Sequence, residues 1–430
     1  MTEDRILVVT DQLPYPPRNS VTLPLFHLVE QLRRSHAVQI CLLQGSGSED
    51  QRPWLADNER RFGPVLRVVL PRRGLMARLW QEITGREMVE HGWRSWSPGI
   101  PKELDAAADD AQVLVTPLSA VARWRVVCDA LPDMRPNTQV ALVNDCRAAA
   151  YRWHLHTRER GLKPFLMALL DRLRSPLIAR IEAQLLRPYR RVLLQTEADR
   201  TAMRRLVGEG TGRRSRLAPN GVRAELFDVR PQRNQRVLLV AELGGEPGRM
   251  AEWLVREVWP LVRQRCPQAE LNIVGRSAGS VLRKLVAGAP GAHHEDHAPD
   301  LVAEYTACGV IWSPVFGGFG LINKTLEGMA CGLPVVGGLA AFNGLAGFKN
   351  WVHGVGLEAP DAKAMAEATA RLLESPEQGA RMGDAARALV HGGFGWERAA
   401  DVVRRAFDRR DPTISRTVPR RGMVMPHPYS

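Results

Sequence analysis

The chain has 430 residues, of which 45% are hydrophobic and 24% charged, a composition typical of globular proteins. This length exceeds what one hydrophobic core comfortably supports, so we expect two domains. The formal net charge of +13, carried mainly by arginine, indicates nucleic acid, an anionic membrane surface or simply a genome rich in arginine codons. No motif that combines aromatic and basic residues for nucleic-acid binding occurs, so we expect no nucleic-acid partner.

The chain opens without a signal-peptide pattern and has no run of about 18 apolar residues. We therefore expect a cytoplasmic protein, with peripheral contact to the inner membrane face as one option. Six scattered cysteines lack CxxC or Cys/His spacing, which predicts reduced core residues rather than disulfides or a zinc site.

Residues 5–10 and 37–43 are predicted strands, joined by a turn-rich segment and a helix. This order is typical of a doubly wound parallel sheet, in which ligands bind at the carboxyl ends of the strands. The loop that contains Arg18, Asn19 and Ser20 follows the first strand. We therefore predict that this loop faces a ligand.

A later predicted strand, residues 140–143, ends at the polar pair Asn144-Asp145. Asp145 is the candidate for the ligand site, and the alternative is that it caps the following helix. Further strands of this half are predicted at 65–70, 113–115 and 192–196.

Ten basic and three acidic residues lie between Tyr151 and Arg191, interleaved with leucine, isoleucine and phenylalanine. The pattern predicts one or two basic amphipathic helices. These helices either contact anionic lipid or pack on the domain as solvated helices.

A turn and a polar, arginine-rich stretch at residues 219–235 separate the two expected domains. The predicted organisation is a first domain at 1–219, a second domain at 232–395, a closing helix at 396–408 and a disordered basic tail at 409–430.

In the second domain, strands at 237–240 and 271–274 are followed by loops that carry Arg249 and Arg276. The segment from His293 to His297 contains three histidines and two acids. It lies between glycine and proline without helical spacing, so we predict a solvated loop rather than a metal site.

The strongest functional signal is residues 311–338, which predict a strand, a glycine loop, a helix and a second strand. The glycines allow the loop to approach a ligand closely, and the first turn of the helix offers unpaired N–H groups to an anion. Asn323, Lys324 and Glu327 fall on or beside this opening. Phosphates would bind the loop and Lys324, and a sugar diol would bind Glu327. The alternative is an ordinary helix start with a surface Lys-Glu pair.

The segment Gly318-Phe319-Gly320-Leu321, followed by E-G-M-A-C-G-L-P-V-V from Glu327 onward, resembles the signature of family 4 retaining glycosyltransferases of the GT-B fold. The pattern G-x-x-N-K-x-L-E is similar to a subgroup that includes exosortase-associated sugar transferases. In the family a second glutamate lies eight residues before the one matched by Glu327, where this chain has Phe319. The resemblance implies two Rossmann-like α/β domains that face each other across a cleft. The implied donor-binding residues are Gly318, Phe319, Gly320, Leu321, Asn323, Lys324, Glu327, Arg276 and Arg249.

The implied reaction transfers a sugar from a nucleotide-sugar donor to an acceptor hydroxyl with retention of configuration, without metal or cofactor. Lys324 and the helix N–H groups would stabilise the leaving diphosphate. Asp145 would face the acceptor, with Arg18, Asn19 and Ser20 on the acceptor side. The acceptor is a glycan, a lipid-linked sugar or a small molecule.

Two alternatives remain. The chain has Glu242 where the family usually has a phosphate-binding arginine, lacks the first glutamate and lacks a glycine pair at Asn19-Ser20. These changes are expected of a GT-B protein that has become a binding or scaffold protein. An epimerase of the same fold would need catalytic carboxylates and a histidine, for which the sequence offers no candidate.

Overall fold

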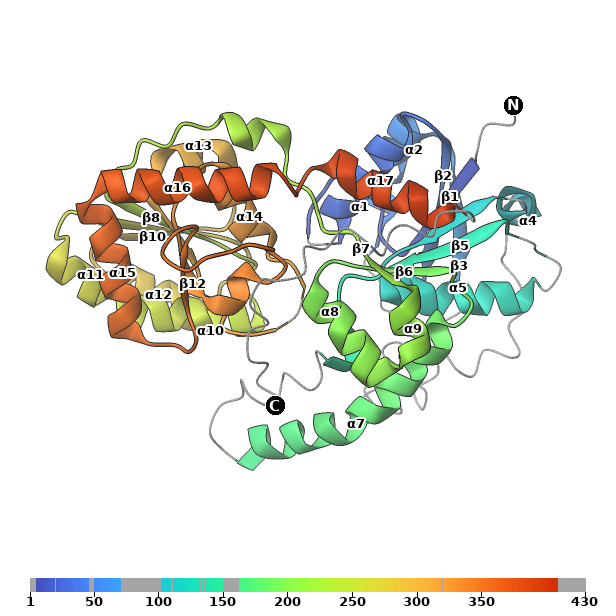
Figure 1. Ribbon diagram of the computed structural model, residues 1–430, viewed down its shortest axis with the longest axis horizontal. Coiled ribbons are helices and arrows are strands. Elements are labelled where there is room, and N and C mark those ends of the chain that lie inside the picture. Colours follow the sequence, from blue (N-terminus) through green and yellow to red (C-terminus); the bar gives the residue numbers. More distant parts are fainter. Residues whose placement is uncertain are drawn as a thin grey trace. The chain divides into compact units, whose positions relative to one another are not determined.

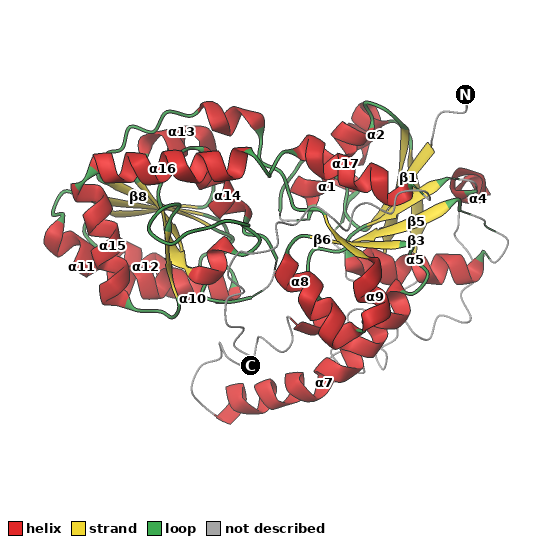
Figure 2. Cartoon of the chain, in the orientation of Figure 1, coloured by secondary structure: helices red, strands yellow, loops and turns green. Residues whose placement is uncertain are grey.

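The structure is a computed structural model that describes residues 5–19, 21–45, 50–70, 102–109, 111–131, 134, 136–149, 162–318 and 320–408. These residues divide into two compact units: residues 5–220 together with 396–408, and residues 221–395. Each unit is a parallel sheet with helices on both faces (Figures 1 and 2). The predicted pair of Rossmann-like α/β domains is therefore confirmed.

The N-terminal unit contains a seven-stranded parallel sheet in the order β3-β2-β1-β4-β5-β6-β7. The chain order reverses between β1 and β4, which makes their carboxyl ends the place where a ligand is expected. The strands are β1 Arg5–Thr10, β2 Ala37–Gln44, β3 Val65–Val69, β4 Gln112–Val115, β5 Thr138–Leu142, β6 Arg191–Leu194 and β7 Ser215–Leu217.

Helices cover both faces of this sheet, and the closing helix α17 lies beside α1 (Figure 1). Val403 and Phe407 of α17 share one buried cluster with Leu25 and Val29 of α1, which fixes α17 in the N-terminal unit. The helices are α1 Thr22–Leu32, α2 Arg52–Phe62, α4 Lys102–Ala108, α5 Leu118–Ala130, α7 Leu162–Leu186, α8 Glu197–Ala202, the π-helix η1 Met203–Val207, α9 Glu209–Arg214 and α17 Trp396–Phe407.

The C-terminal unit contains a six-stranded parallel sheet in the order β10-β9-β8-β11-β12-β13. Val237 and Leu239 belong to one buried cluster and Leu238 to another, so both faces of β8 are covered. The strands are β8 Arg236–Val240, β9 Glu270–Val274, β10 Ala292–Glu295, β11 Val310–Ser313, β12 Val335–Gly338 and β13 Val355–Leu357.

Helices also cover both faces of the second sheet (Figure 2). They are the 3-10 helix η2 Ala224–Asp228, α10 Gly245–Trp253, the π-helix η3 Leu254–Val258, α11 Trp259–Arg265, α12 Ser280–Gly288, α13 Leu301–Ala307, α14 Asn323–Ala330, the 3-10 helix η4 Leu339–Phe342, α15 Ala362–Glu374 and α16 Pro376–His391.

Three sequence-based expectations can be compared with these elements. The basic segment forms one described helix, α7, with Pro176 inside it, while residues 151–161 lie outside the described residues, as does the tail 409–430. All six cysteines are free, and all but Cys128 are buried. In the part of the chain that the structure describes, no helix is both long and apolar enough to span a membrane.

The prediction of a loop from His293 to His297 is wrong for residues 293–295. Ala292–Glu295 is the edge strand β10, paired in parallel with β9. The His294 imidazole Nε2 lies 3.0 Å from the carbonyl oxygen of Gly275. An edge strand tolerates polar residues because part of it faces water, which is why the composition resembled a loop.

Candidate functional site

The order of the second sheet reverses between β8 and β11, which are hydrogen-bonded neighbours. The loops that follow these strands, 241–244 and 314–322, therefore start at the same edge of the sheet. The first leads into α10 and the second into α14. The sequence-predicted glycine loop thus lies at the position where doubly wound sheets bind ligands.

The glycine loop uses backbone conformations that suit glycine. Gly318 has φ of 110° and Gly320 has φ of 86°, both in the left-handed region. The carbonyl oxygen of Gly318 accepts a hydrogen bond of 3.3 Å from the side-chain amide of Asn343. Phe319 lies outside the described residues.

Helix α14 begins directly after this loop. The residue before the helix, Ile322, has an apolar side chain and makes no capping hydrogen bond. The first-turn N–H groups and the positive end of the helix dipole therefore favour an anion at this point. Asn323 is the first residue of the helix, and Leu321 immediately precedes Ile322.

Glu327 is the centre of a buried hydrogen-bonded group. Its side chain is 8% exposed, and Oε2 accepts hydrogen bonds from the Tyr305 hydroxyl at 2.8 Å and from Lys324 Nζ at 2.7 Å. The pKa of Tyr305 is raised well above its ordinary value, mainly by burial and secondly by the neighbouring Glu327 carboxylate. The phenol therefore remains a donor. Oε1 receives no hydrogen bond from the described residues. The carboxylate is thus held through one oxygen.

This geometry argues against the alternative of a surface Lys-Glu pair, because Glu327 is buried and Lys324 is 36% exposed. Tyr305 was missed by the sequence analysis. It lies on α13, 22 residues before Glu327, and a single tyrosine in a helix carries no signal for such a contact.

The loop after β8 meets the turn after β9. A Cβ on Gly275 would lie 1.7 Å from the carbonyl oxygen of Ala241, so only glycine permits this approach. Arg276 pairs with Glu242 at 3.8 Å, and Ser277 donates its hydroxyl to the same carboxylate. Both members of the ion pair are 58% exposed, so the pair itself contributes little to stability.

The predicted cations of the donor site have different surroundings. Arg276 faces Glu242, whereas Arg249 is an exposed residue of α10. Lys324 is the cation that the structure places directly beside the glycine loop and Glu327. Within the described residues, no group of three or more His, Cys, Asp or Glu side chains is arranged to hold a metal ion.

The corresponding edge of the first sheet lies at the carboxyl ends of β1 and β4. Asp11, directly after β1, accepts hydrogen bonds from Ser119 at 2.6 Å and from Arg123 at 3.1 Å. Burial raises the pKa of Asp11 and outweighs the lowering by Arg123 and Ser119. Its Oδ1 is buried and has no hydrogen-bond partner among the described residues.

The loop after β1 is held by α2. The backbone N–H groups of Leu13 and Tyr15 donate to the side chains of Gln51 and Asn58, at 2.9 and 3.0 Å. The Arg18 guanidinium lies over the Trp54 ring, 3.3 Å from its centroid. Trp54 and Asn58 belong to α2 and Gln51 directly precedes it, a segment that the sequence analysis had not connected with the loop.

Asn19 has a structural contact that the sequence analysis did not predict. Its Oδ1 accepts hydrogen bonds of 2.9 Å from the N–H groups of Val21 and Thr22, at the start of α1. Asn19 therefore satisfies two N–H groups that a helix start leaves unpaired. Ser20 lies outside the described residues.

Asp145 follows β5, as predicted, and burial raises the pKa of its carboxyl group, with Arg147 lowering it to a smaller extent. The capping alternative is not what the structure shows. The N–H groups of Arg147 and Ala148 instead donate to the Glu182 carboxylate of α7, at 3.1 and 3.0 Å. Burial raises the pKa of Glu182 to about 7, although these two hydrogen bonds lower it.

A row of amides also runs along this edge and was not found from the sequence. Gln195, after β6, donates to Asn220 at 3.2 Å and to Asn144 at 3.5 Å. The three side chains follow β5, β6 and β7, which are adjacent strands. The edge near Asp145 is therefore lined with hydrogen-bonding groups.

Comparison with known proteins finds one family model and a set of solved structures that resemble the chain. Residues 234–375, which lie in the C-terminal unit, match the model of the family described as Glycosyl transferases group 1. The match includes Tyr305, Lys324 and Glu327. No curated protein sequence matches the chain.

Solved structures resemble nearly the whole chain. Alr3699/HepE of Anabaena, crystallised with UDP and glucose, has 14% identity and a TM-score of 0.65, and the likeness covers 93% of this chain and 98% of that one. Sucrose-phosphate synthase of Thermosynechococcus elongatus has 18% identity and a TM-score of 0.61, and the likeness covers 94% of this chain and 98% of that one. A glycosyltransferase of Rickettsia africae has 11% identity and a TM-score of 0.61, and the likeness covers 95% of this chain and 98% of that one. At these identities the likeness shows the fold, which is GT-B.

Proposed function

We propose that this protein is a glycosyltransferase that moves a sugar from a nucleotide-sugar to an acceptor hydroxyl. The observation that carries the proposal is the Glu327 carboxylate, held through one oxygen by Tyr305 and Lys324 beside the glycine loop. Its second oxygen is suited to accept a hydrogen bond from a ribose diol. The group lies inside the segment that matches the glycosyltransferase family model.

The donor would bind with its diphosphate at the start of α14. Lys324 Nζ and the first-turn N–H groups supply positive charge where negative charge develops on the leaving diphosphate. Gly318, Phe319, Gly320 and Leu321 would form the wall of this site. Asn323, Arg249 and Arg276 are the further proposed donor contacts.

We assign the acceptor to the N-terminal domain, residues 1–219, and the donor to the C-terminal domain, residues 232–395. Asp145 would accept a hydrogen bond from the acceptor hydroxyl, and its raised pKa makes it a stronger proton acceptor than an exposed aspartate. Arg18, Asn19 and Ser20 remain the proposed acceptor-side loop. The contacts of Arg18 and Asn19 give that loop a defined shape.

The finer proposals rest on the resemblance of residues 318–336 to family 4 enzymes and to the exosortase-associated subgroup. They are retention of configuration and transfer without metal or cofactor, to a glycan, lipid-linked or small-molecule acceptor. The Anabaena structure contains UDP and glucose, so uridine nucleotides are the first donors to test.

A binding protein without transferase activity is the second candidate, because one observation favours it. Glu242 places a carboxylate at the carboxyl end of β8, where it neutralises Arg276 and would repel a diphosphate. Such a protein would bind the nucleotide weakly or would bind it without turnover.

Turnover distinguishes the two candidates. The purified chain is incubated with UDP-glucose, GDP-mannose and other nucleotide-sugars, with and without a panel of glycan acceptors, and release of the nucleoside diphosphate is followed. The enzyme hypothesis predicts release from one donor that accelerates with an acceptor and is lost in Lys324→Ala. Tight nucleotide binding without release from any donor would support the binding role instead.

A further inference from the structure

Helix α7 presents one exposed stripe in its described part. Residues three or four positions apart lie on the same face of a helix. Leu169 and Leu173 are 44% and 69% exposed and lie one helical turn apart, so together they form an exposed apolar patch. The stripe continues toward the C-terminus through exposed polar and basic residues. Its members are Leu169, Leu173, Pro176, Arg180 and Gln184.

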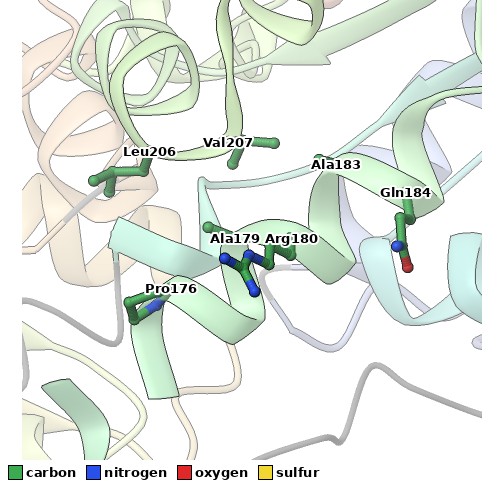
Figure 3. A pocket seen from close by; sticks show the side chains of 7 residues that line it. All are labelled: Pro176, Ala179, Arg180, Ala183, Gln184, Leu206 and Val207. Atoms are coloured by element: carbon green, nitrogen blue, oxygen red, sulfur yellow. The ribbon is translucent and has the colours of Figure 1, made fainter. Parts of the chain in front are cut away.

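A groove lies beside this stripe, between α7 and the π-helix η1. It has a volume of about 390 Å³, and Pro176, Ala179 and Ala183 of α7 line it opposite Leu206 and Val207 (Figure 3). Arg180 and Gln184 also line this groove, so the stripe continues into a groove with both apolar and polar lining residues.

Arginine side chains lie beside this groove. Arg204 and Arg205 are exposed on η1, next to the groove residues Leu206 and Val207. In the described ranges, neither these two residues nor Arg180 forms an ion pair with a carboxylate. Glu182, the acid of α7 with a described side chain, is fully buried and bonded to backbone N–H groups.

We propose that this stripe and groove, which we call the α7 surface, dock on an anionic lipid bilayer. Exposed leucines gain free energy when they enter the boundary between headgroups and acyl chains. Guanidinium groups at the same surface bind lipid phosphates and are attracted by the negative surface potential. An apolar stripe that is both uncovered and rimmed by arginine fits a lipid interface better than either feature alone.

Two other occupants fit less well. A nucleic acid would use the arginines but gains little from two exposed leucines, since base stacking needs aromatic side chains. A second copy of the chain would bring like charges together, which is unfavourable. The inference goes beyond the proposed transferase activity and does not depend on it, because binding to lipid needs no nucleotide-sugar.

The test is co-sedimentation of the full chain with vesicles, without any nucleotide. We expect binding to vesicles of equal parts phosphatidylglycerol and phosphatidylcholine, weaker binding as salt rises, and little binding to phosphatidylcholine alone. Equal binding to both vesicle types, or none to the anionic vesicles, would overturn the proposal.

Two pairs of substitutions locate the contact on different elements, so a folding defect in one pair leaves the other informative. Leu169→Ser with Leu173→Ser, and separately Arg204→Glu with Arg205→Glu, should each weaken binding to anionic vesicles by at least about tenfold. Thermal unfolding checks that each variant is folded.

Matched controls come from exposed residues of the C-terminal unit: Val281→Ser with Val352→Ser, and Arg256→Glu with Arg381→Glu. These should bind vesicles as the natural protein does. The proposal is wrong if the α7 variants bind as tightly as the controls, or if the leucine pair instead converts an oligomer into monomers.

Discussion

The two sheets reverse their strand order in the same way, but their switch points are built differently. In the C-terminal unit, the loop after β11 has glycines in left-handed conformations and leads to a carboxylate with one oxygen unbonded by the described residues. In the N-terminal unit, the loop after β1 is filled by side chains of its own unit, including Trp54 and Asn58. The edge of the C-terminal sheet therefore offers groups of the kind that the proposed donor requires, whereas the loop at the edge of the N-terminal sheet is held by side chains of its own unit.

The two edges also differ in how far apart in the sequence their contacting residues lie. Lys324 and Glu327 are three residues apart on one helix, so their contact is already present in the sequence pattern. Asn58 reaches Tyr15 across 43 residues, and Glu182 reaches Arg147 across 35. Contacts between residues that are distant in the sequence hold the loops at the edge of the N-terminal sheet. Substitutions in the C-terminal unit should therefore affect the proposed donor function, and substitutions in the N-terminal unit should affect stability.

The largest effect is expected for Lys324→Ala. Loss of one cation that stabilises the leaving diphosphate should lower kcat by about 100-fold to 1,000-fold, or about 3 kcal/mol. Nucleotide affinity should change less, because the helix N–H groups remain. Steady-state kinetics with the productive donor measures both quantities, and Lys284→Ala on exposed α12 is the control. An unchanged kcat would remove Lys324 from the chemistry.

Glu182 makes the stability of the N-terminal unit depend on pH. Its pKa is raised from 4.5 to about 7, so between these values the folded state binds the proton more tightly than the unfolded chain. The free energy of unfolding should therefore fall as pH rises through this range, by up to about 3 kcal/mol. Glu182→Gln should flatten this dependence, whereas the exposed Glu209→Gln should not. Urea unfolding between pH 4.5 and pH 8 provides the comparison.

Asn58→Ala tests whether the Asn58 side chain supports the loop after β1 and does not bind the donor. The buried Asn58 amide bonds the backbone N–H and carbonyl of Tyr15 and the carbonyl of Trp54. Its removal leaves these groups without partners and should destabilise the protein by about 2 kcal/mol. Nucleotide affinity, measured by calorimetry on the folded variant, should not change. A large loss of nucleotide affinity with unchanged stability would place the donor at this edge instead.

How much the sequence predicts follows from this contrast. The buried strands, the glycine loop and the Lys324-Glu327 pair depend on neighbouring residues, and the structure shows all of them. Tyr305, Glu182, Gln51 and Asn58 depend on folding partners far along the chain, and no spacing reveals them. The sequence of β10 resembles that of a loop because histidines and acids lie at a sheet edge. The donor and acceptor assignments themselves remain predictions.

Calorimetric titration of the natural protein and of Glu327→Ala with UDP, GDP and TDP tests the central claim most directly. Tyr305→Phe, which keeps the carboxylate but removes one of its hydrogen bonds, serves as the intermediate variant. If Glu327 holds the ribose, one nucleotide binds the natural protein and loses about 2 kcal/mol of binding free energy, about thirtyfold in affinity, in Glu327→Ala. Tyr305→Phe should lose less. Equal affinity of the natural protein and a folded Glu327→Ala variant would contradict the account.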